Sequence, residues 1–146
     1  MHPMGQEMKS LKIRAVTDNL DAVLDFVNEQ LENMGCTMKN QIQIDMAVEE
    51  LFVNIAHYAY RNGTGDARIL AGPDPESGDP RVLRITLMDK GIPFNPLEKK
   101  DPDISLSVED REIGGLGIFM AKKVMDHMDY CYKDGQNVLT MTRKVC

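Results

Sequence analysis

The sequence predicts an α+β fold: a two-layer α/β sandwich in which helices cover one face of a mixed, mainly antiparallel sheet. The chain has 146 residues, which is the size of one domain. Strand-like and helix-like segments both occur along it, and most strands adjoin one another through turns rather than helical crossovers. That order favours antiparallel neighbours. The helical segments carry their apolar residues on one face, as helices that cover a sheet do.

Local periodicity and turn residues define the predicted elements. In chain order they are a strand at 11–15, helices at 18–34 and 38–60, strands at 67–71 and 81–88, a helix at 116–128, and strands at 130–132 and 138–145. Residues 1–10 are predicted to be a loose N-terminus, and residues 11–146 a single domain. The sequence contains no internal repeat and no long linker that would divide it further.

The first three elements follow from simple patterns. Leu11, Ile13 and Ala15 alternate with charged residues, which is the period of a half-buried strand. The two helices that follow have apolar residues three and four apart, so each buries one broad face. Gly35 ends the first helix, and the pair Asn62-Gly63 ends the second.

Turn chemistry organises the second half of the chain. Residues 72–80 are rich in Gly, Pro and Asp, and they predict a loop between two antiparallel strands. Asp134-Gly135 predicts the turn of a closing hairpin. Between these features, residues 89–113 contain three prolines and little periodicity. A segment of this kind is typical of a functional lid or of disorder.

Composition and charge exclude several classes of protein. Apolar residues make up 42% and charged residues 27% of the chain, which is a globular mixture. The net charge is −6 without a basic stripe, which argues against direct nucleic-acid binding. No apolar run approaches the roughly 20 residues that span a membrane, and the first ten residues lack a signal-peptide core. Three widely spaced cysteines fit reduced thiols in a cytoplasmic protein.

A carboxylate and a carboxamide share one face of the second predicted helix. Glu50 and Asn54 are four residues apart, so their side chains are neighbours on the helix surface. Their oxygens are suited to bind Mg²⁺ or to orient a water or hydroxyl group. The simpler interpretation is a solvated helix flank, because polar pairs at this spacing are common.

A second candidate motif, Asp89-x-Gly91-x-Pro93, follows directly after a predicted strand. An Asp at the end of a strand followed by Gly is typical of a ligand-binding loop, because glycine lets the backbone approach closely. The Asp89 carboxylate can accept a hydrogen bond from an exocyclic amine such as that of adenine. The alternative interpretation is a plain turn.

A third motif, Gly114-Gly115-Leu116-Gly117, leads into the third predicted helix. Free amide groups at a helix N-terminus can hold anionic oxygens, and the helix dipole favours them. The spacing is neither that of a dinucleotide-binding motif nor that of a P-loop, and a hinge or ordinary helix start is the alternative. Together, the three motifs supply a metal-side pair, an amine acceptor and an anion cradle, which suits a Mg-nucleotide.

In the order and spacing of these motifs, the chain resembles the GHKL superfamily of ATPases and kinases. The resemblance is specifically to the small anti-sigma-factor serine kinases of bacteria, and it covers nearly the whole chain from about Leu11. It implies the ATP-binding (Bergerat) fold of that superfamily, with ATP and Mg²⁺ as cofactors. The chain is too short to include the helix pair of histidine kinases or the transducer domain of gyrase-like ATPases.

The resemblance also implies roles for the matching residues. Glu50 corresponds to the general base that acts on the partner's serine hydroxyl, and Asn54 to the ligand of the phosphate-bound Mg²⁺. Asp89 corresponds to the residue that binds the adenine amino group. Gly91 gives close approach in that motif, and Pro93 completes it.

The implied phosphate site lies further along the chain. The backbone of Gly114, Gly115, Leu116 and Gly117 corresponds to the loop that holds the phosphates. Arg111 lies near the position of a lid arginine in these kinases, which suggests a contact with the γ-phosphate.

One departure concerns the residues after Asn54. The histidine that family members often carry four residues beyond this Asn is His57 here, one position early, and Tyr58 stands in its place. We therefore assign His57 no catalytic role, and expect His57 and Tyr58 to be packing or ribose-side residues.

The leading functional hypothesis is an ATP-dependent protein serine/threonine kinase of the anti-sigma type. The resemblance implies an anti-anti-sigma (STAS-type) protein as substrate and a sigma factor or another regulator as second partner. Small kinases of this type are often homodimers. A second class stays open: a nucleotide-gated protein-binding switch that binds ATP or ADP without significant phosphotransfer. Glu50 favours the kinase, since a pure nucleotide sensor needs no base there. The three intact motifs argue against an interaction domain with a dead nucleotide site.

Overall fold

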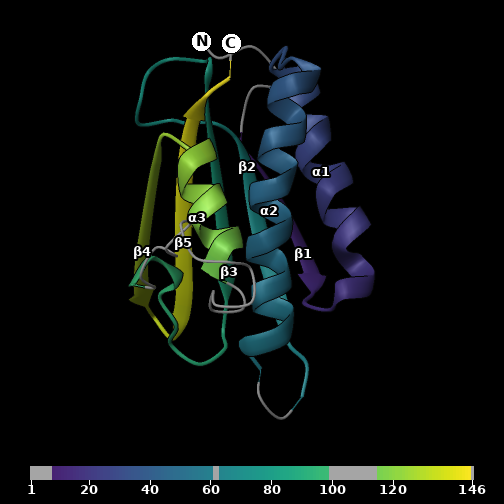
Figure 1. The fold of residues 1–146 in the computed structure, drawn as a ribbon, viewed down its shortest axis with the longest axis vertical. Coiled ribbons are helices and arrows are strands. Elements are labelled where there is room, and N and C mark those ends of the chain that lie inside the picture. The colour runs from purple at the N-terminus through teal and green to yellow at the C-terminus, as the bar shows by residue number, and fades with distance from the viewer. Residues whose placement is uncertain (1–7, 61–62, 99–114, 146) are drawn as a thin grey trace, which may run out of the picture.

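The computed structural model describes residues 8–60, 63–98 and 115–145. In chain order, the elements are β1 (Lys9–Arg14), η1 (Thr17–Asn19), α1 (Leu20–Asn33), α2 (Met38–Tyr58), β2 (Asp66–Pro73), β3 (Val82–Asp89), η2 (Pro96–Glu98), α3 (Gly115–Val124), β4 (His127–Lys133) and β5 (Gln136–Lys144). Figure 1 shows two layers, with α1, α2 and α3 side by side in front of one sheet. The predicted α+β sandwich is confirmed.

The sheet has five strands in the order β1-β2-β3-β5-β4. All four pairings among the described residues are antiparallel, so the parallel component of the expected mixed sheet is not among them. The predicted connection at residues 72–80 does join an antiparallel pair, β2 and β3. In the closing hairpin, Asp134 and Gly135 both have positive φ, as the tight turn between β4 and β5 requires.

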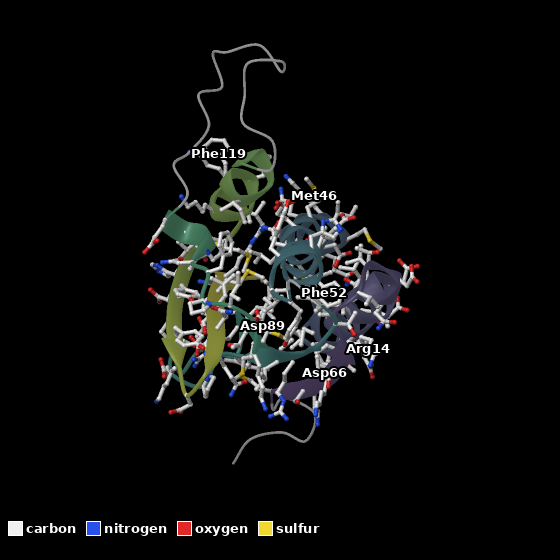
Figure 2. The ribbon with its side chains drawn as sticks, turned by 90° about the horizontal axis from the view of Figure 1, so that it is seen from below. Arg14, Met46, Phe52, Asp66, Asp89 and Phe119 are labelled. Atoms are coloured by element: carbon white, nitrogen blue, oxygen red, sulfur yellow. The ribbon has the colours of Figure 1, made fainter. Side chains whose placement is uncertain are left out.

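The core lies between the sheet and the inner faces of the helices. Alternate residues of the strands point toward the helices, for example Ile69 of β2 and Ile85 of β3, both fully buried. Figure 2 shows Phe52 of α2 in this interior, where its side chain is 0% exposed. α2 packs between α1 and α3, so it is the central helix of its layer.

Several predicted boundaries differ from the structure by one to four residues, and strand pairing explains two of these differences. The strand predicted from Leu11 begins at Lys9, because Lys9 and Ser10 already pair with β2. The third helix ends at Val124 rather than Met128, because pairing with β5 starts immediately afterwards. The backbone amide of Asp126 donates to the Thr142 carbonyl at 2.9 Å, and the Asp126 carboxylate accepts from the Lys144 amide at 2.9 Å. Of the apolar residues beyond Val124, Met125 still donates its amide to the Ala121 carbonyl at 3.0 Å, whereas Met128 belongs to the strand β4, which begins three residues before the strand predicted at 130–132.

Within the described ranges, none of the helices combines the length and the apolar character needed to cross a membrane.

Candidate functional site

Helix α2 carries two of the candidate residues toward two different hollows. Thr37 caps the helix by accepting a hydrogen bond from the Asn40 amide at 3.3 Å, and the apolar residues Leu51 and Phe52 hold its inner face on the core. Asn54 lines a pocket between α2 and the sheet. Glu50, one turn earlier, lines a groove between α2 and α3. Both side chains are half-buried.

The pocket next to Asn54 has mainly apolar walls. Its lining comes from α2, the end of β3, the segment that follows β3, and the strands β4 and β5: Leu51, Asn54, Ile55, Tyr58, Ala59, Leu87, Asp89, Ile92, Phe94, Pro96, Tyr130, Asn137 and Leu139. An apolar pocket with a few convergent polar groups is the usual form of a small-molecule site.

Asp89 is the carboxylate of this pocket. It is the last residue of β3 and follows the inward alternation of that strand, so its side chain is only 5% exposed. Figure 2 shows Asp89 in the interior, between the sheet and α2. Its Oδ1 atom accepts hydrogen bonds from the Gly91 amide and from Asn137 Nδ2, both at 2.9 Å. These two donors fix the orientation of the carboxylate at the pocket wall.

Gly91 explains how the segment after β3 reaches the end of α2. A Cβ atom on Gly91 would overlap the backbone and side chain of Ala59, so only glycine fits at this approach. The next residue secures the contact, since the Ile92 amide donates to the Ala59 carbonyl at 3.0 Å. Pro93, by contrast, is exposed and lines an open depression that does not include Asp89.

Tyr60 supports the same segment from the other side. Its hydroxyl accepts a hydrogen bond from the Lys90 amide at 2.9 Å and donates to the Asp66 carbonyl at 2.7 Å. Burial raises the pKa of Tyr60 above its ordinary value, so the hydroxyl keeps the proton that it donates. The segment after β3 is therefore fastened both to the end of α2 and to the start of β2.

Glu50 and Gly117 meet although they come from different motifs. A Cβ atom on Gly117 would overlap the carboxyl group of Glu50, so the absence of a side chain on α3 provides the space that this carboxylate occupies. The structure thus brings the first and third motifs into contact between α2 and α3. Gly115 and Leu116 form the first residues of α3, whereas Arg111 and Gly114 lie outside the described residues.

The residues present fit a Mg-nucleotide. Asp89 offers a hydrogen-bond acceptor inside a mainly apolar pocket, as a base with an exocyclic amine requires. In the described part of the chain, no group of three or more His, Cys, Asp or Glu side chains could enclose a metal ion. Mg²⁺ is commonly held by one or two protein ligands together with phosphate oxygens and water. Asn54 would be the protein ligand in such an arrangement.

His57 and Tyr58 were expected to be packing or ribose-side residues, and the structure does not place either of them in the core. His57 and Tyr58 are both exposed, and their rings are in edge-to-face contact with centroids 6.0 Å apart. Tyr58 lines the pocket beside Asn54, while His57 is not among the lining residues described.

Asn137 is a site residue that the sequence patterns did not reveal. It is 7% exposed, lies in register with Asp89 on the neighbouring strand, and bonds to the Asp89 carboxylate. A usable signal existed, because Asn137 is the polar member of an inward-facing series with Leu139 and Met141. A polar residue at such a position must find partners, and here one of them is the candidate ligand residue.

Comparison with known proteins shows a family and a set of relatives to which the chain is similar. The family described as "Histidine kinase-like ATPase domain" matches residues 13–143. The serine-protein kinase RsbW of Bacillus mycoides (strain KBAB4) is 28% identical over 116 residues, covering 77% of this chain and 69% of that protein. RsbW of Bacillus thuringiensis subsp. konkukian (strain 97-27) is 29% identical over 116 residues, which again cover 77% of this chain and 69% of that protein.

A solved structure gives the same architecture. The crystal structure of the RsbU and RsbW domains of a Mycobacterium tuberculosis protein aligns with a TM-score of 0.62 at 17% identity. The alignment covers 94% of this chain, which spans 32% of the solved one. At this identity, the likeness concerns the fold.

Proposed function

This chain belongs to the family of histidine kinase-like ATPase domains, and we propose that it is an ATP-dependent protein serine/threonine kinase. The observation that carries the proposal is the placement of Glu50. Its carboxylate lies against Gly117 of α3, one helical turn from Asn54, which lines the pocket of Asp89. A base is thus set beside the start of a helix and next to a mainly apolar pocket that contains a buried carboxylate. Similarity to serine-protein kinases supports the same conclusion.

The proposed roles follow from the geometry of each residue. Asp89 accepts a hydrogen bond from the adenine amino group, and Asn54 contributes an oxygen ligand to Mg²⁺. The first amide groups of α3 have no partners within the helix, so they are suited to hold phosphate oxygens. Mg-ATP, when bound, supplies the phosphoryl group that is transferred. Glu50 takes the proton from the acceptor hydroxyl, which leaves the oxygen able to attack.

The surface beside Glu50 supports a protein as the acceptor. The groove between α2 and α3 contains exposed apolar side chains, with Met46 49% and Met120 41% exposed. Figure 2 shows Met46 at the outer surface of the helical layer. Methionine adapts its shape to different contacts and is common at protein-binding surfaces. We therefore propose that a serine or threonine of a docked STAS-type anti-anti-sigma protein approaches Glu50 here, in the manner of an anti-sigma regulator.

The experiment that tests the kinase is a phosphotransfer assay combined with nucleotide titration. The acceptor is a STAS-domain protein from the same organism, and its phosphorylated residue is identified by mass spectrometry. The wild type should phosphorylate a serine or threonine. Glu50→Gln should lower the rate by a factor on the order of 100 or more, the usual worth of a general base, while ATP affinity stays within about twofold. Glu29→Gln, an exposed change on α1, is the matched control.

Two outcomes would contradict the assigned role of Glu50. Glu50→Gln could retain the phosphotransfer rate of the wild type, or it could lose ATP binding together with transfer. A third outcome, tight ATP binding by the wild type without transfer to any STAS-domain protein, would favour the nucleotide-gated switch over the kinase.

A further inference from the structure

Asn137 uses its whole hydrogen-bonding capacity within the protein. Its Oδ1 atom accepts from the Phe94 amide at 3.0 Å and from the Tyr130 hydroxyl. Its Nδ2 atom donates to Asp89 Oδ1 at 2.9 Å and to the Ile92 carbonyl at 2.8 Å. A side-chain amide has two donor hydrogens and two acceptor positions, so all four are occupied. Asn137 therefore has no donor or acceptor left for a ligand, although it lines the pocket.

Three of these four partners belong to one short segment, the Asp89 loop (residues 89–94). The amide of Asn137 connects the carboxylate at the start of this loop with a carbonyl in its middle and an amide at its end. The fourth partner, Tyr130, lies on the strand β4 that pairs with β5. One buried side chain thus ties the loop to the sheet at three points.

The same contacts determine which oxygen of Asp89 is available. Within the described residues, both hydrogen bonds to this carboxylate are accepted by Oδ1, from the Gly91 amide and from Asn137 Nδ2. Oδ2 is then the oxygen that can receive a donor from a molecule in the pocket. An acceptor at this position suits a base with an amino group and opposes a base with a carbonyl oxygen there.

We propose that Asn137 is a positioning residue that fixes the Asp89 loop and turns Asp89 Oδ2 toward the base of the nucleotide. It sets the preference for an adenine over a guanine base through Asp89 and does not itself touch the ligand. This inference rests on the proposed function, because it assigns a specificity role within the same nucleotide site. In the protein without nucleotide, the Asp89 loop therefore already has its binding conformation.

The substitution Asn137→Asp keeps the oxygen that accepts hydrogen bonds and replaces the amide nitrogen that donates them by a second oxygen. An Asp of the same shape keeps an oxygen for the Phe94 amide and the Tyr130 hydroxyl, but it places a second carboxyl oxygen against Asp89 Oδ1. Two carboxylates that share a site favour binding of one proton, and the protonated form can donate to Asp89 Oδ1 as the amide did, while the bond to the Ile92 carbonyl stays lost. The variant should therefore regain its hydrogen bond to Asp89 as the pH falls.

The groups around this position do not obscure that signal. Within the described residues, the titratable side chains that bond to this amide or lie opposite it are Asp89, Tyr130 and Tyr132, and Cys131 and Tyr60 interact with these groups. Burial raises the pKa of Tyr60 and of Tyr130, so these two phenols titrate further from neutrality than usual. The wild type over the same pH range accounts for all other groups.

The first measurement is calorimetric titration with Mg-ATP and with Mg-GTP from pH 8 to pH 5. At pH 8, Asn137→Asp should bind ATP at least about tenfold more weakly than the wild type and should prefer ATP over GTP less strongly, as expected for loss of a hydrogen bond to a charged group. The loss should shrink as the pH falls. Asn95→Asp is the matched control, because the Asn95 side chain lies next to the loop and accepts a hydrogen bond from the Leu97 amide at 2.9 Å.

The second measurement uses the protein without nucleotide. Hydrogen exchange of the Gly91 amide should be faster in Asn137→Asp than in the wild type at pH 8, with an unchanged circular dichroism spectrum. Wild-type exchange there, or an affinity loss of equal size at every pH, would overturn the positioning role. Failure of the wild type to bind ATP would instead overturn the proposed function, while the exchange experiment would still report on the loop.

Discussion

Gly117 illustrates how a single missing side chain contributes to the site. The carboxyl group of Glu50 occupies the volume in which a Cβ atom of residue 117 would lie. Because these are the outer atoms of a flexible side chain, they can move if a methyl group is added. The position of the proposed base is therefore determined by a residue that lies far from it in the sequence.

We predict that Gly117→Ala displaces Glu50 and lowers phosphotransfer by about tenfold or more, since small misplacements of a catalytic group are costly. The free energy of unfolding should not fall, because alanine favours a helix more than glycine does. The phosphotransfer assay and urea unfolding measure the two effects. Gly63→Ala is the matched control, because a Cβ atom there meets open space. Wild-type transfer by Gly117→Ala would show that Glu50 does not depend on this contact.

The roles of individual residues were predictable to different degrees. Asp89 and Gly91 were visible in the sequence because strand-end carboxylates and close-approach glycines have a local signature. The contact of Gly117 with Glu50 was not visible, because it depends on how α2 and α3 pack. The polar residue Asn137 stands out in its inward-facing series, but its role was not visible, since three of its four partners lie more than forty positions away in the chain.

At the scale of elements, the contact between α1 and α2 contains an uncompensated polar pair. Asn28 Nδ2 of α1 donates to Asp45 Oδ2 of α2 at 3.2 Å. The Oδ1 atoms of both residues are buried without a hydrogen-bond partner among the described residues. Burial raises the pKa of Asp45; the hydrogen bond from Asn28 lowers it and the nearby Glu49 raises it. The ionised form of Asp45 is thus disfavoured by the fold.

We predict that Asp45→Asn stabilises the protein at pH 7 by on the order of 1 kcal/mol, the worth of one buried hydrogen bond. The amide removes the charge and offers a donor to Asn28 Oδ1. Because the pKa of Asp45 is raised on folding, its stabilising contribution is present below its ordinary pKa and is lost as the pH rises through the raised value. The advantage of the variant should therefore decrease as the pH falls toward 4.

Urea unfolding at pH 7 and near pH 4 measures this difference. The exposed change Asp25→Asn on α1 is the control, and it should leave the stability nearly unchanged. A variant that is less stable than the wild type at pH 7, or one whose gain in stability does not depend on pH, would show that burial does not disfavour the ionised form of Asp45.

Element types were predictable from the sequence, but their boundaries were less so, and the end of the third helix differed most. The helix of residues 115–124 was expected to continue to Met128, because Met125 and Met128 fit a helical period. The end of this segment also fits a strand that begins at His127, with Met128 and Tyr130 alternating inward. Pairing with β5 decides between the two, and such a non-local interaction leaves no local signal.

At the scale of the whole molecule, the fold places residues of three distant motifs around the central helix α2, in the pocket of Asp89 and in the groove of Glu50. α2 supplies Glu50 and Asn54, the end of β3 supplies Asp89, and the start of α3 brings Gly117 against Glu50. The expected resemblance to histidine kinase-like ATPases is confirmed by the match over residues 13–143. The order of motifs was readable in the sequence, whereas the shape of the pocket depends on the layer packing in Figure 1.

The most direct test of the nucleotide site is calorimetric titration of the purified protein with Mg-ATP and Mg-GTP, beside Asp89→Asn. An Asn at this position can keep an oxygen for the Gly91 amide and Asn137 while presenting a donor to the ligand. We predict that the wild type binds Mg-ATP and prefers it to Mg-GTP, and that the variant binds ATP about tenfold or more weakly. Equal affinity for ATP and GTP, or unchanged ATP binding by the variant, would contradict the role of Asp89 and with it the nucleotide site described here.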